Sequence, residues 1–297
     1  MLFFIMTQLT LIGMSVGAVV STTALFALSA MMSPNLVKMF FVGQGLSQTL
    51  PVGLNILFTA LPGFDVRETS CVGFGAGGVL VAAVMVLFYF FTVNWYVTPF
   101  ITKSIELSEM NVEDTLNSGQ SKVIDLIPKA MKFGFVTFFL HFTTLSFYPG
   151  LMSLLRQSDK NSKIDEKLFL LVHMLAVVTV SDFMGKICAQ FIKFPGKNVI
   201  VYFTLARVVL GLLLAMCNIQ PRTIPVWFVP DWSPSLILFI LGFTHGHLIS
   251  LSYSFAPSVV ENGLDKAVVS TIHHCCTFLG LLGGIGMSYL IQFLINL

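Results

Sequence analysis

Long apolar runs are the feature of this sequence that most restricts its fold. About eight segments are almost wholly apolar over roughly 20 positions or more, the length that a helix needs to cross the hydrocarbon core of a bilayer. These segments are 4–31, 35–60, 72–98, 132–152, 167–192, 198–218, 233–256 and 268–295. In lipid, only helices and closed barrels satisfy their backbone hydrogen bonds, and unbroken runs lack the alternating pattern of barrel strands. The sequence therefore predicts an all-α integral membrane protein with about eight transmembrane helices.

The composition agrees with this fold class and excludes several functions. Charged residues make up 10% of the 297 residues, whereas soluble domains carry about 25%. The net charge of +2 is too small to indicate a nucleic-acid partner. The five cysteines show no CxxC spacing, so we expect neither a disulfide framework nor a zinc site. No phosphate-binding loop, nucleophile elbow or pair of hydrolytic carboxylates is recognisable, so we expect neither an enzyme nor a bound cofactor.

A polar stretch at 101–131 divides the spans into two groups. It carries several glutamates and lysines, and we expect it to be a loop outside the bilayer. The sequence thus predicts three transmembrane helices in 1–100 and a five-helix bundle in 132–297. The positive-inside rule favours a cytoplasmic position for the loop. The first apolar run has no basic segment before it, so we interpret it as a span and not as a signal peptide.

Asp182 is the acidic residue that lies deepest in a predicted span. A charge at the bilayer centre costs roughly 2.5 to 10 kcal/mol or more, so such a residue faces a bundle interior or a watery cavity. Lys186 follows four residues later on the same helix face and can neutralise it in part. Arg207, in the next span, lies at a similar depth. A carboxylate between two cations could bind the hydroxyl groups of a polar solute, and a charge cluster that only ties helices together is the structural alternative.

Histidines in the last two spans raise the question of a metal site. His245 and His247 form an HxH pair, and His273 and His274 are adjacent. Two histidines in an HxH pair point to different faces of a helix, and no second carboxylate is present to complete a ligand set. We therefore expect no metal site. His141 and His173 are interpreted as polar groups packed inside the bundle.

Glycine patterns in several spans indicate close helix packing. Gly73–Gly77 and Gly280–Gly284 have the GxxxG spacing that lets two helices approach closely in lipid. The pair Gly43 and Gly45 is interpreted in the same way, because it does not open a helix behind a strand as a nucleotide-binding loop would. These patterns predict packing and give no information on a substrate.

Four stretches, taken together and in order, resemble the signatures of the equilibrative nucleoside transporter family. FFVGQGLSQTLP (40–51) resembles the Ser-Gly-Gln-Gly-Leu signature of its fifth span, and SDFMGK (181–186) its Phe-Asp-x-x-Gly-Arg motif in the eighth. Residues 194–222 are similar to its run of Pro-Gly-Lys, Leu-Ala-Arg and Cys-Asn-x-x-Pro-Arg, and 242–260 to its Ser-Asn-Gly-Tyr-Leu stretch. The resemblance extends from about residue 5 to 297. It implies a major-facilitator-like bundle of eleven spans, of which this chain matches spans four to eleven and lacks the first three. The three helices of 1–100 would then be the remainder of the N-terminal bundle.

The resemblance also implies roles for five residues. Asp182 would accept hydrogen bonds from the ribose hydroxyls, with Lys186 at the position of the family's arginine. Arg207 matches the arginine of the ninth span. Ser21 stands where a glutamine of the fourth span often contacts the base, and His245 stands at the asparagine position of Ser-Asn-Gly.

The resemblance thus implies a multi-pass carrier, most consistent with the plasma membrane, that passes nucleosides or nucleobases across the lipid bilayer by facilitated diffusion and alternating access. Partner helices could supply the missing N-terminal spans. Two alternatives stay open. One is a proton- or metal-coupled solute carrier that uses Asp182 and the histidines, and the other is a truncated membrane protein without transport activity.

Overall fold

The computed structural model describes residues 2–60, 66–93, 97–109, 122–158, 169–223 and 225–296, and the chain within these ranges is almost entirely helical. The long helices are α1 (Leu2–Met32), α2 (Pro34–Ala60), α3 (Val66–Thr92), α4 (Thr98–Glu109), α6 (Val123–Phe147), α8 (Val177–Phe191), α9 (Ile200–Ala215), α10 (Trp232–Phe255) and α11 (Gly263–Asn296). A π-helical segment, η2 (Leu171–Ala176), leads into α8, and short 3-10 turns form η1 (Met152–Leu154) and η3 (Ala256–Val259). In the described ranges, β structure is limited to two isolated bridges.

Each predicted span coincides with a helix, although several boundaries differ. The predicted loop at 101–131 is partly helical, because α4 runs to Glu109 and α6 begins at Val123, before the predicted start at 132. The rest of this loop, 110–121, lies outside the described residues, as do 61–65, between the second and third predicted spans, and 159–168, around the start of the fifth. That the chain forms eight spans in a major-facilitator-like arrangement stays a prediction.

Within the described ranges, three helices are long and apolar enough to cross a membrane by length and composition: Gln8–Met32, Trp232–Val259 and Gly263–Ile295. Shorter apolar helices extend over Gly75–Phe90 and Ile200–Ala215. The exposure of the side chains also agrees with a protein that lies in a membrane. Leu87 on α3 and Leu282 on α11 are both 68% exposed, while Arg207 is only 2% exposed. Exposed apolar side chains, together with charged side chains buried in the interior, suit a protein solvated by lipid.

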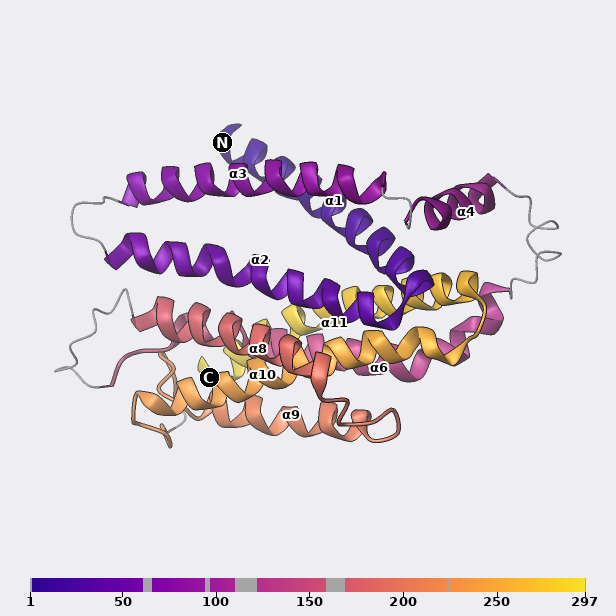
Figure 1. Ribbon diagram of the computed structural model, residues 1–297. Coiled ribbons are helices and arrows are strands. Elements are labelled where there is room, and N and C mark those ends of the chain that lie inside the picture. Colours follow the sequence, from indigo (N-terminus) through magenta and orange to yellow (C-terminus); the bar gives the residue numbers. More distant parts are fainter. Residues whose placement is uncertain are drawn as a thin grey trace.

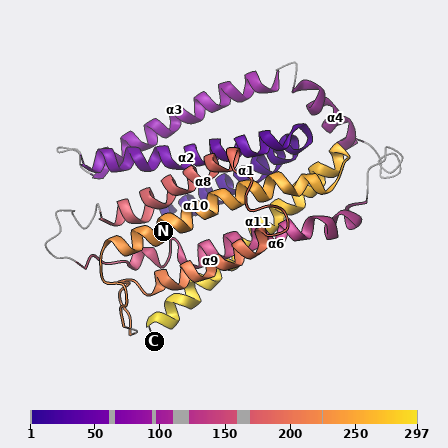
Figure 2. The same cartoon turned by 60° about the horizontal axis from the view of Figure 1, so that its bottom comes forward.

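Most of the long helices run along a common direction and pack in layers, and α1 crosses this direction obliquely (Figure 1). Helices α6, α8, α9, α10 and α11 form the C-terminal bundle, in which α10 packs extensively on α8, and α11 on α6. Helix α2 lies over α8 and α10, and α1 packs along α11. Both views place α3 on the outer side of α2, which is its main contact in the described part of the chain (Figure 2). The first helices of the chain therefore cover the C-terminal bundle on one side.

Glycines explain the close packing of α11 against α6. A Cβ atom added at Gly280 would meet the carbonyl oxygen of Phe138, and one at Gly284 would meet that of Phe142 at 2.8 Å. The predicted role of Gly280–Gly284 in packing is confirmed. Gly73 and Gly77 on α3 differ, because no described atom lies within 4 Å of a Cβ added at either position.

Candidate functional site

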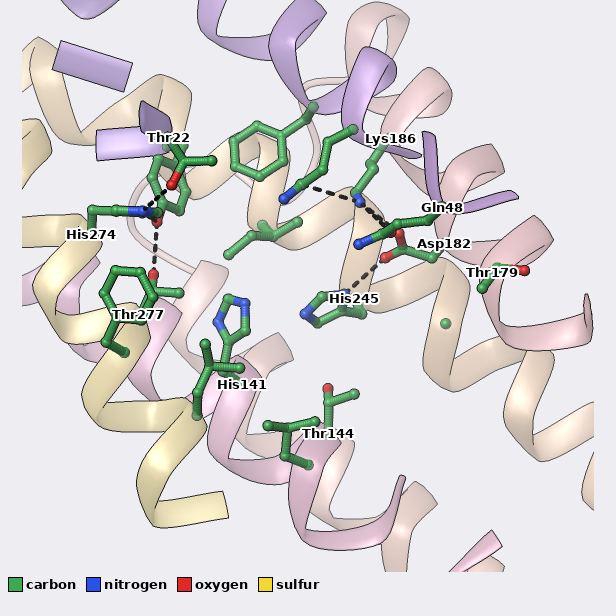
Figure 3. A pocket seen from close by; sticks show the side chains of 18 of the residues that line it. Thr22, Gln48, His141, Thr144, Thr179, Asp182, Lys186, His245, His274 and Thr277 are labelled. Carbon is green, nitrogen blue, oxygen red and sulfur yellow. Dashed lines mark hydrogen bonds and ion pairs between the residues drawn. The ribbon is translucent and has the colours of Figure 1, made fainter. Parts of the chain in front are cut away.

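A cavity of about 590 Å³ lies where α1 and α2 meet the C-terminal bundle. Its volume falls within the range of roughly 300–1,000 Å³ that is typical of small-molecule sites. The polar residues that line it are Thr22, Gln44, Gln48, His141, Thr144, Tyr148, Thr179, Asp182, Lys186, His245, Tyr253, His274 and Thr277. Figure 3 shows two polar groups on opposite walls, with Lys186, Asp182 and His245 on one side and Thr22, His274 and Thr277 on the other.

The first polar group is centred on Asp182 of α8. Its Oδ2 lies 2.7 Å from Lys186 Nζ, and its Oδ1 lies 2.8 Å from His245 Nδ1 on α10. The side chain of Asp182 is 9% exposed and that of Lys186 only 3%. The predicted pairing of Asp182 with Lys186 is confirmed, and its burial is tolerated because the carboxylate is bonded on both oxygens.

Two glutamines of α2 complete the surroundings of Lys186. Its Nζ lies 3.4 Å from both Gln44 Oε1 and Gln48 Oε1, to which it donates hydrogen bonds. These residues lie in the stretch that resembles the fifth-span signature, one helical turn apart and on the same face of α2. The ammonium group therefore connects α2 with α8.

Small residues bring α10 close enough for His245 to reach Asp182. A Cβ at Gly246 would meet the carbonyl oxygen of Asp182, and one at Gly185 would meet that of Phe243. Gly45 of α2 has a similar role, because its Cβ would lie 2.8 Å from the ring of Phe183 and 3.1 Å from Cδ of Lys186. The interpretation of Gly45 as a packing residue is confirmed.

The two histidines of the HxH pair point to different places, as predicted. His245 lines the cavity and bonds Asp182, whereas His247 Nε2 lies 2.6 Å from the carbonyl oxygen of Phe194. His245 Nε2 is buried and has no hydrogen-bond partner among the described residues. His141 of α6 packs edge-on against His245, with ring centroids 5.2 Å apart, and also lines the cavity.

Arg207 lies behind the cavity wall and does not line it. Its guanidinium donates to the carbonyl oxygens of Leu140 and Leu241, and to the hydroxyl oxygens of Thr144 and Thr244, at 2.9–3.4 Å. The structure therefore does not place Asp182 between two cations of adjacent spans as predicted. Arg207 instead ties α6 to α10 and positions Thr144, which does line the cavity.

Ser21 also lies outside the cavity lining. Its side chain is exposed, while the next residue, Thr22, contributes to the cavity. Successive residues are about 100° apart around a helix, so one position decides which side chain points inward. The structure thus replaces Ser21 by Thr22 as the polar group that α1 presents to the cavity.

The second polar group was not singled out by the sequence patterns. Tyr253 of α10 has its hydroxyl oxygen 2.7 Å from both His274 Nδ1 and Thr277 Oγ1 of α11. His274 Nε2 lies 3.4 Å from Thr22 Oγ1. The spacing of His274 and Thr277 places them on one face of α11, a signal that could have been found, but their contact with Tyr253 depends on tertiary packing.

The arrangement suits an uncharged polar solute with hydroxyl groups. A carboxylate, an imidazole nitrogen and an ammonium group lie together on one wall, and aromatic side chains of Phe26 and Phe41 also line the cavity. The described residues contain no group of three His, Cys, Asp or Glu side chains that could hold a metal ion.

Comparison with known proteins identifies the family. A family model described as "Nucleoside transporter" matches residues 6–293. The chain belongs to the equilibrative nucleoside transporter family. The resemblance seen in the sequence motifs is thereby confirmed, and together with the apolar helices it makes the chain an integral membrane protein. The family is one of transporters, which are typically not enzymes.

Curated relatives support the same assignment. The chain is 26% identical over 173 residues to equilibrative nucleoside transporter 3 of Rattus norvegicus. The aligned region covers 56% of this chain and 36% of the rat protein. It is 26% identical over 191 residues to equilibrative nucleoside transporter 1 of Homo sapiens, covering 63% of this chain and 42% of the human protein. A match to equilibrative nucleoside transporter 4 of Danio rerio has 32% identity over 120 residues, 40% of this chain and 22% of that protein. The chain thus spans less than half the length of these relatives.

Proposed function

We propose that this chain carries nucleosides across a membrane by facilitated diffusion. The observation that carries the proposal is the buried Asp182 carboxylate, which lines a cavity of about 590 Å³ within a nucleoside transporter family fold. Residues from both predicted bundles line this cavity, including Gln44 of α2 and His245 of α10. A site between two bundles is the arrangement on which alternating access operates.

Asp182 is proposed to bind the ribose. The neighbouring hydroxyl groups of ribose are both donors and acceptors, so they require acceptors and a donor within a short distance. A carboxylate only accepts, so His245 must donate its Nδ1 proton to Asp182. In the neutral imidazole, Nε2 then has a free lone pair, and this nitrogen lacks a partner among the described residues. Asp182 and His245 Nε2 offer two adjacent acceptors. Lys186 offers a donor beside them when a ribose hydroxyl replaces one of its long 3.4 Å bonds to Gln44 or Gln48.

The other predicted residues take indirect roles in this proposal. Arg207 holds α6 and α10 together and positions Thr144, so it acts through the cavity wall and not on the solute. Ser21 is exposed, so Thr22 is the polar residue of α1 that lines the cavity and would face the substrate. The plasma membrane is proposed as the location, and helices beyond this chain as partners that complete the N-terminal bundle.

Uptake of labelled uridine and adenosine tests the proposal. Cells without endogenous nucleoside carriers would express this chain or its Asp182→Ala variant at matched surface levels. We expect saturable uptake by the chain, and a loss of at least about tenfold in the variant, because the variant lacks a charged acceptor. Saturable uptake that is equal in both forms would exclude Asp182 as the ribose acceptor. No uptake by either form would instead favour a membrane protein that does not transport by itself.

A proton-coupled carrier is the second candidate, and one specific observation favours it. His141, His245 and Asp182 form a row of titratable groups in the cavity, with the rings of the two histidines 5.2 Å apart. Lys186 borders this row on the side of Asp182, Arg207 lies behind it, and His273 and His274 lie on α11. The same uptake assay distinguishes the two candidates, because an imposed proton gradient accelerates uptake only by a coupled carrier.

A further inference from the structure

The second polar group of the cavity has a hydrogen-bond pattern that can reverse its direction. Tyr253, His274 and Thr277 are each no more than 6% exposed, and all three line the cavity. Their wall faces the one that holds Asp182 (Figure 3). If Asp182 binds the ribose of a nucleoside, as proposed above, the base extends away from that wall, and this polar group is available to meet it.

In one direction, the cluster presents a hydrogen-bond donor to the cavity. Thr277 donates its hydroxyl proton to the Tyr253 oxygen, and Tyr253 donates to His274 Nδ1, with both distances at 2.7 Å. The neutral imidazole then carries its proton on Nε2. The hydroxyl of Thr22 already donates to the carbonyl oxygen of Ala18 at 2.7 Å, so it can only accept from this proton, at a long 3.4 Å.

In the other direction, the same atoms present an acceptor. His274 donates from Nδ1 to the Tyr253 oxygen, and Tyr253 donates to Thr277, whose own proton turns to the backbone carbonyl oxygen of His273 at 3.5 Å. His274 Nε2 now has a free lone pair. The two distances of 2.7 Å are compatible with both directions, because either hydroxyl oxygen can donate or accept.

We infer that Tyr253, His274 and Thr277 recognise the nucleobase, and that their reversible hydrogen bonds let one site accept bases with an amino group and bases with a carbonyl group. His274 Nε2 donates to a carbonyl oxygen in the first direction and accepts from an amino group in the second. The long contact to Thr22 is weak and is readily replaced by a contact with the base.

The aromatic surroundings of this cluster suit a flat ring. Phe26 packs against Tyr253 and His274, with ring centroids 4.6 and 5.0 Å apart, and Phe41 packs against Tyr253 at 4.9 Å. Both phenylalanines line the cavity. Aromatic side chains bind bases by stacking without selecting among them, because every base has a π-face. Discrimination between bases is therefore left to the polar atoms of the cluster.

The variant Thr277→Val would restrict the hydrogen bonds of the cluster to the first direction. Without Thr277 Oγ1, the second direction leaves the buried Tyr253 proton without an acceptor, whereas the first still lets Tyr253 donate to His274. Adenosine and inosine differ by an amino group and a carbonyl group at the same position of the base. Equilibrium binding of each to the purified chain in nanodiscs should therefore show adenosine affinity falling about tenfold relative to inosine affinity in the variant.

Two controls keep this experiment decisive. Thr143→Val makes the same change at a buried threonine of α6 that does not line the cavity, and it should leave both affinities unchanged. If Asp182→Ala abolishes binding while Thr277→Val leaves the ratio of affinities as it is in the unmodified chain, the base assignment is overturned and the proposed ribose site stands. If the unmodified chain binds neither nucleoside, the proposed function fails, and the base assignment with it.

Discussion

Asp182 and Lys186 form a buried ion pair of 2.7 Å within a single turn of α8. The ammonium group also donates to two glutamine side chains of α2, and the carboxylate also accepts from His245 of α10. Three helices thus meet at one pair of charges. The pair is therefore both a part of the cavity wall and a connection between the first helices of the chain and the C-terminal bundle.

Lys186→Met should destabilise the protein strongly. The substitution keeps much of the side-chain volume but leaves the Asp182 carboxylate with His245 as its one partner among the described residues. Removing one partner of a buried pair costs about 3–5 kcal/mol, because the other charge stays buried without compensation. The measurement is the temperature of unfolding of the purified protein in detergent, followed by tryptophan fluorescence. The double variant Asp182→Asn with Lys186→Met should recover much of the loss, and a single variant as stable as the unmodified protein would contradict a structural role for the pair.

Gly246→Ala should separate α10 from α8. An added Cβ would meet the backbone carbonyl oxygen of Asp182, which cannot move away as a flexible side chain could. Such overpacking costs about 1–3 kcal/mol, and we expect it to weaken the bond between His245 and Asp182 as well. Gly77→Ala on α3 is the matched control, because no described atom lies within 4 Å of its added Cβ. The control should be neutral or more stable by up to about 1 kcal/mol, since alanine favours helix more than glycine does. Equal unfolding temperatures for the two variants would show that α8 and α10 do not require this close approach.

Local geometry explains which parts of this site could be predicted from the sequence. Asp182 and Lys186 are four residues apart on one helix, so the helical repeat alone places them together. The divergence of His245 and His247 follows from the same repeat. The positions of the helices follow from the apolar runs, but several of their ends do not. Helix α3 begins at Val66, before its apolar run, and the charged residues of 101–131 obscure the periodic pattern of α4 and of the start of α6.

Tertiary packing decides the rest. Arg207 was expected beside Asp182 on the basis of similar depth, but the rotation of α9 directs it towards Thr144 and Leu241. Depth along a helix does not define the direction around it. In the same way, α1 is apolar on all sides, so its sequence did not show that Thr22 and not Ser21 points inward.

Arg207→Lys should lower stability more than it lowers substrate affinity. A lysine has three donors on a single nitrogen and cannot reproduce the planar guanidinium, which bonds two carbonyl oxygens and two hydroxyl oxygens on α6 and α10. We expect a loss of about 2–4 kcal/mol in the free energy of unfolding, from several hydrogen bonds to a charged group at roughly 1.5–3 kcal/mol each, partly retained by the lysine. Uptake measured at matched surface levels should show a KM for uridine within about twofold of the unmodified value, because no contact with substrate is lost. A large rise in KM without a loss of stability would instead place Arg207 in the substrate site.

His245→Phe should remove the recognition of one ribose hydroxyl. The substitution keeps a planar ring beside His141 but removes Nε2, the buried nitrogen that has no partner among the described residues. In the unmodified chain, binding of 2′-deoxyuridine and 3′-deoxyuridine should each be weaker than that of uridine, by roughly tenfold for one lost hydrogen bond. In His245→Phe, uridine itself should bind about tenfold more weakly, and one of the two deoxy analogues should show no further loss, because its missing hydroxyl is the one that donates to Nε2.

The control is His247→Phe, the same change on the face of α10 away from the cavity. It should leave the relative affinities of uridine and the two deoxy analogues unaltered, because His247 bonds the backbone of Phe194 and does not line the cavity. If instead both analogues bind His245→Phe more weakly than uridine does, by the same factors as in the unmodified chain, His245 only orients Asp182. The carboxylate and Lys186 would then be sufficient to explain the recognition of ribose.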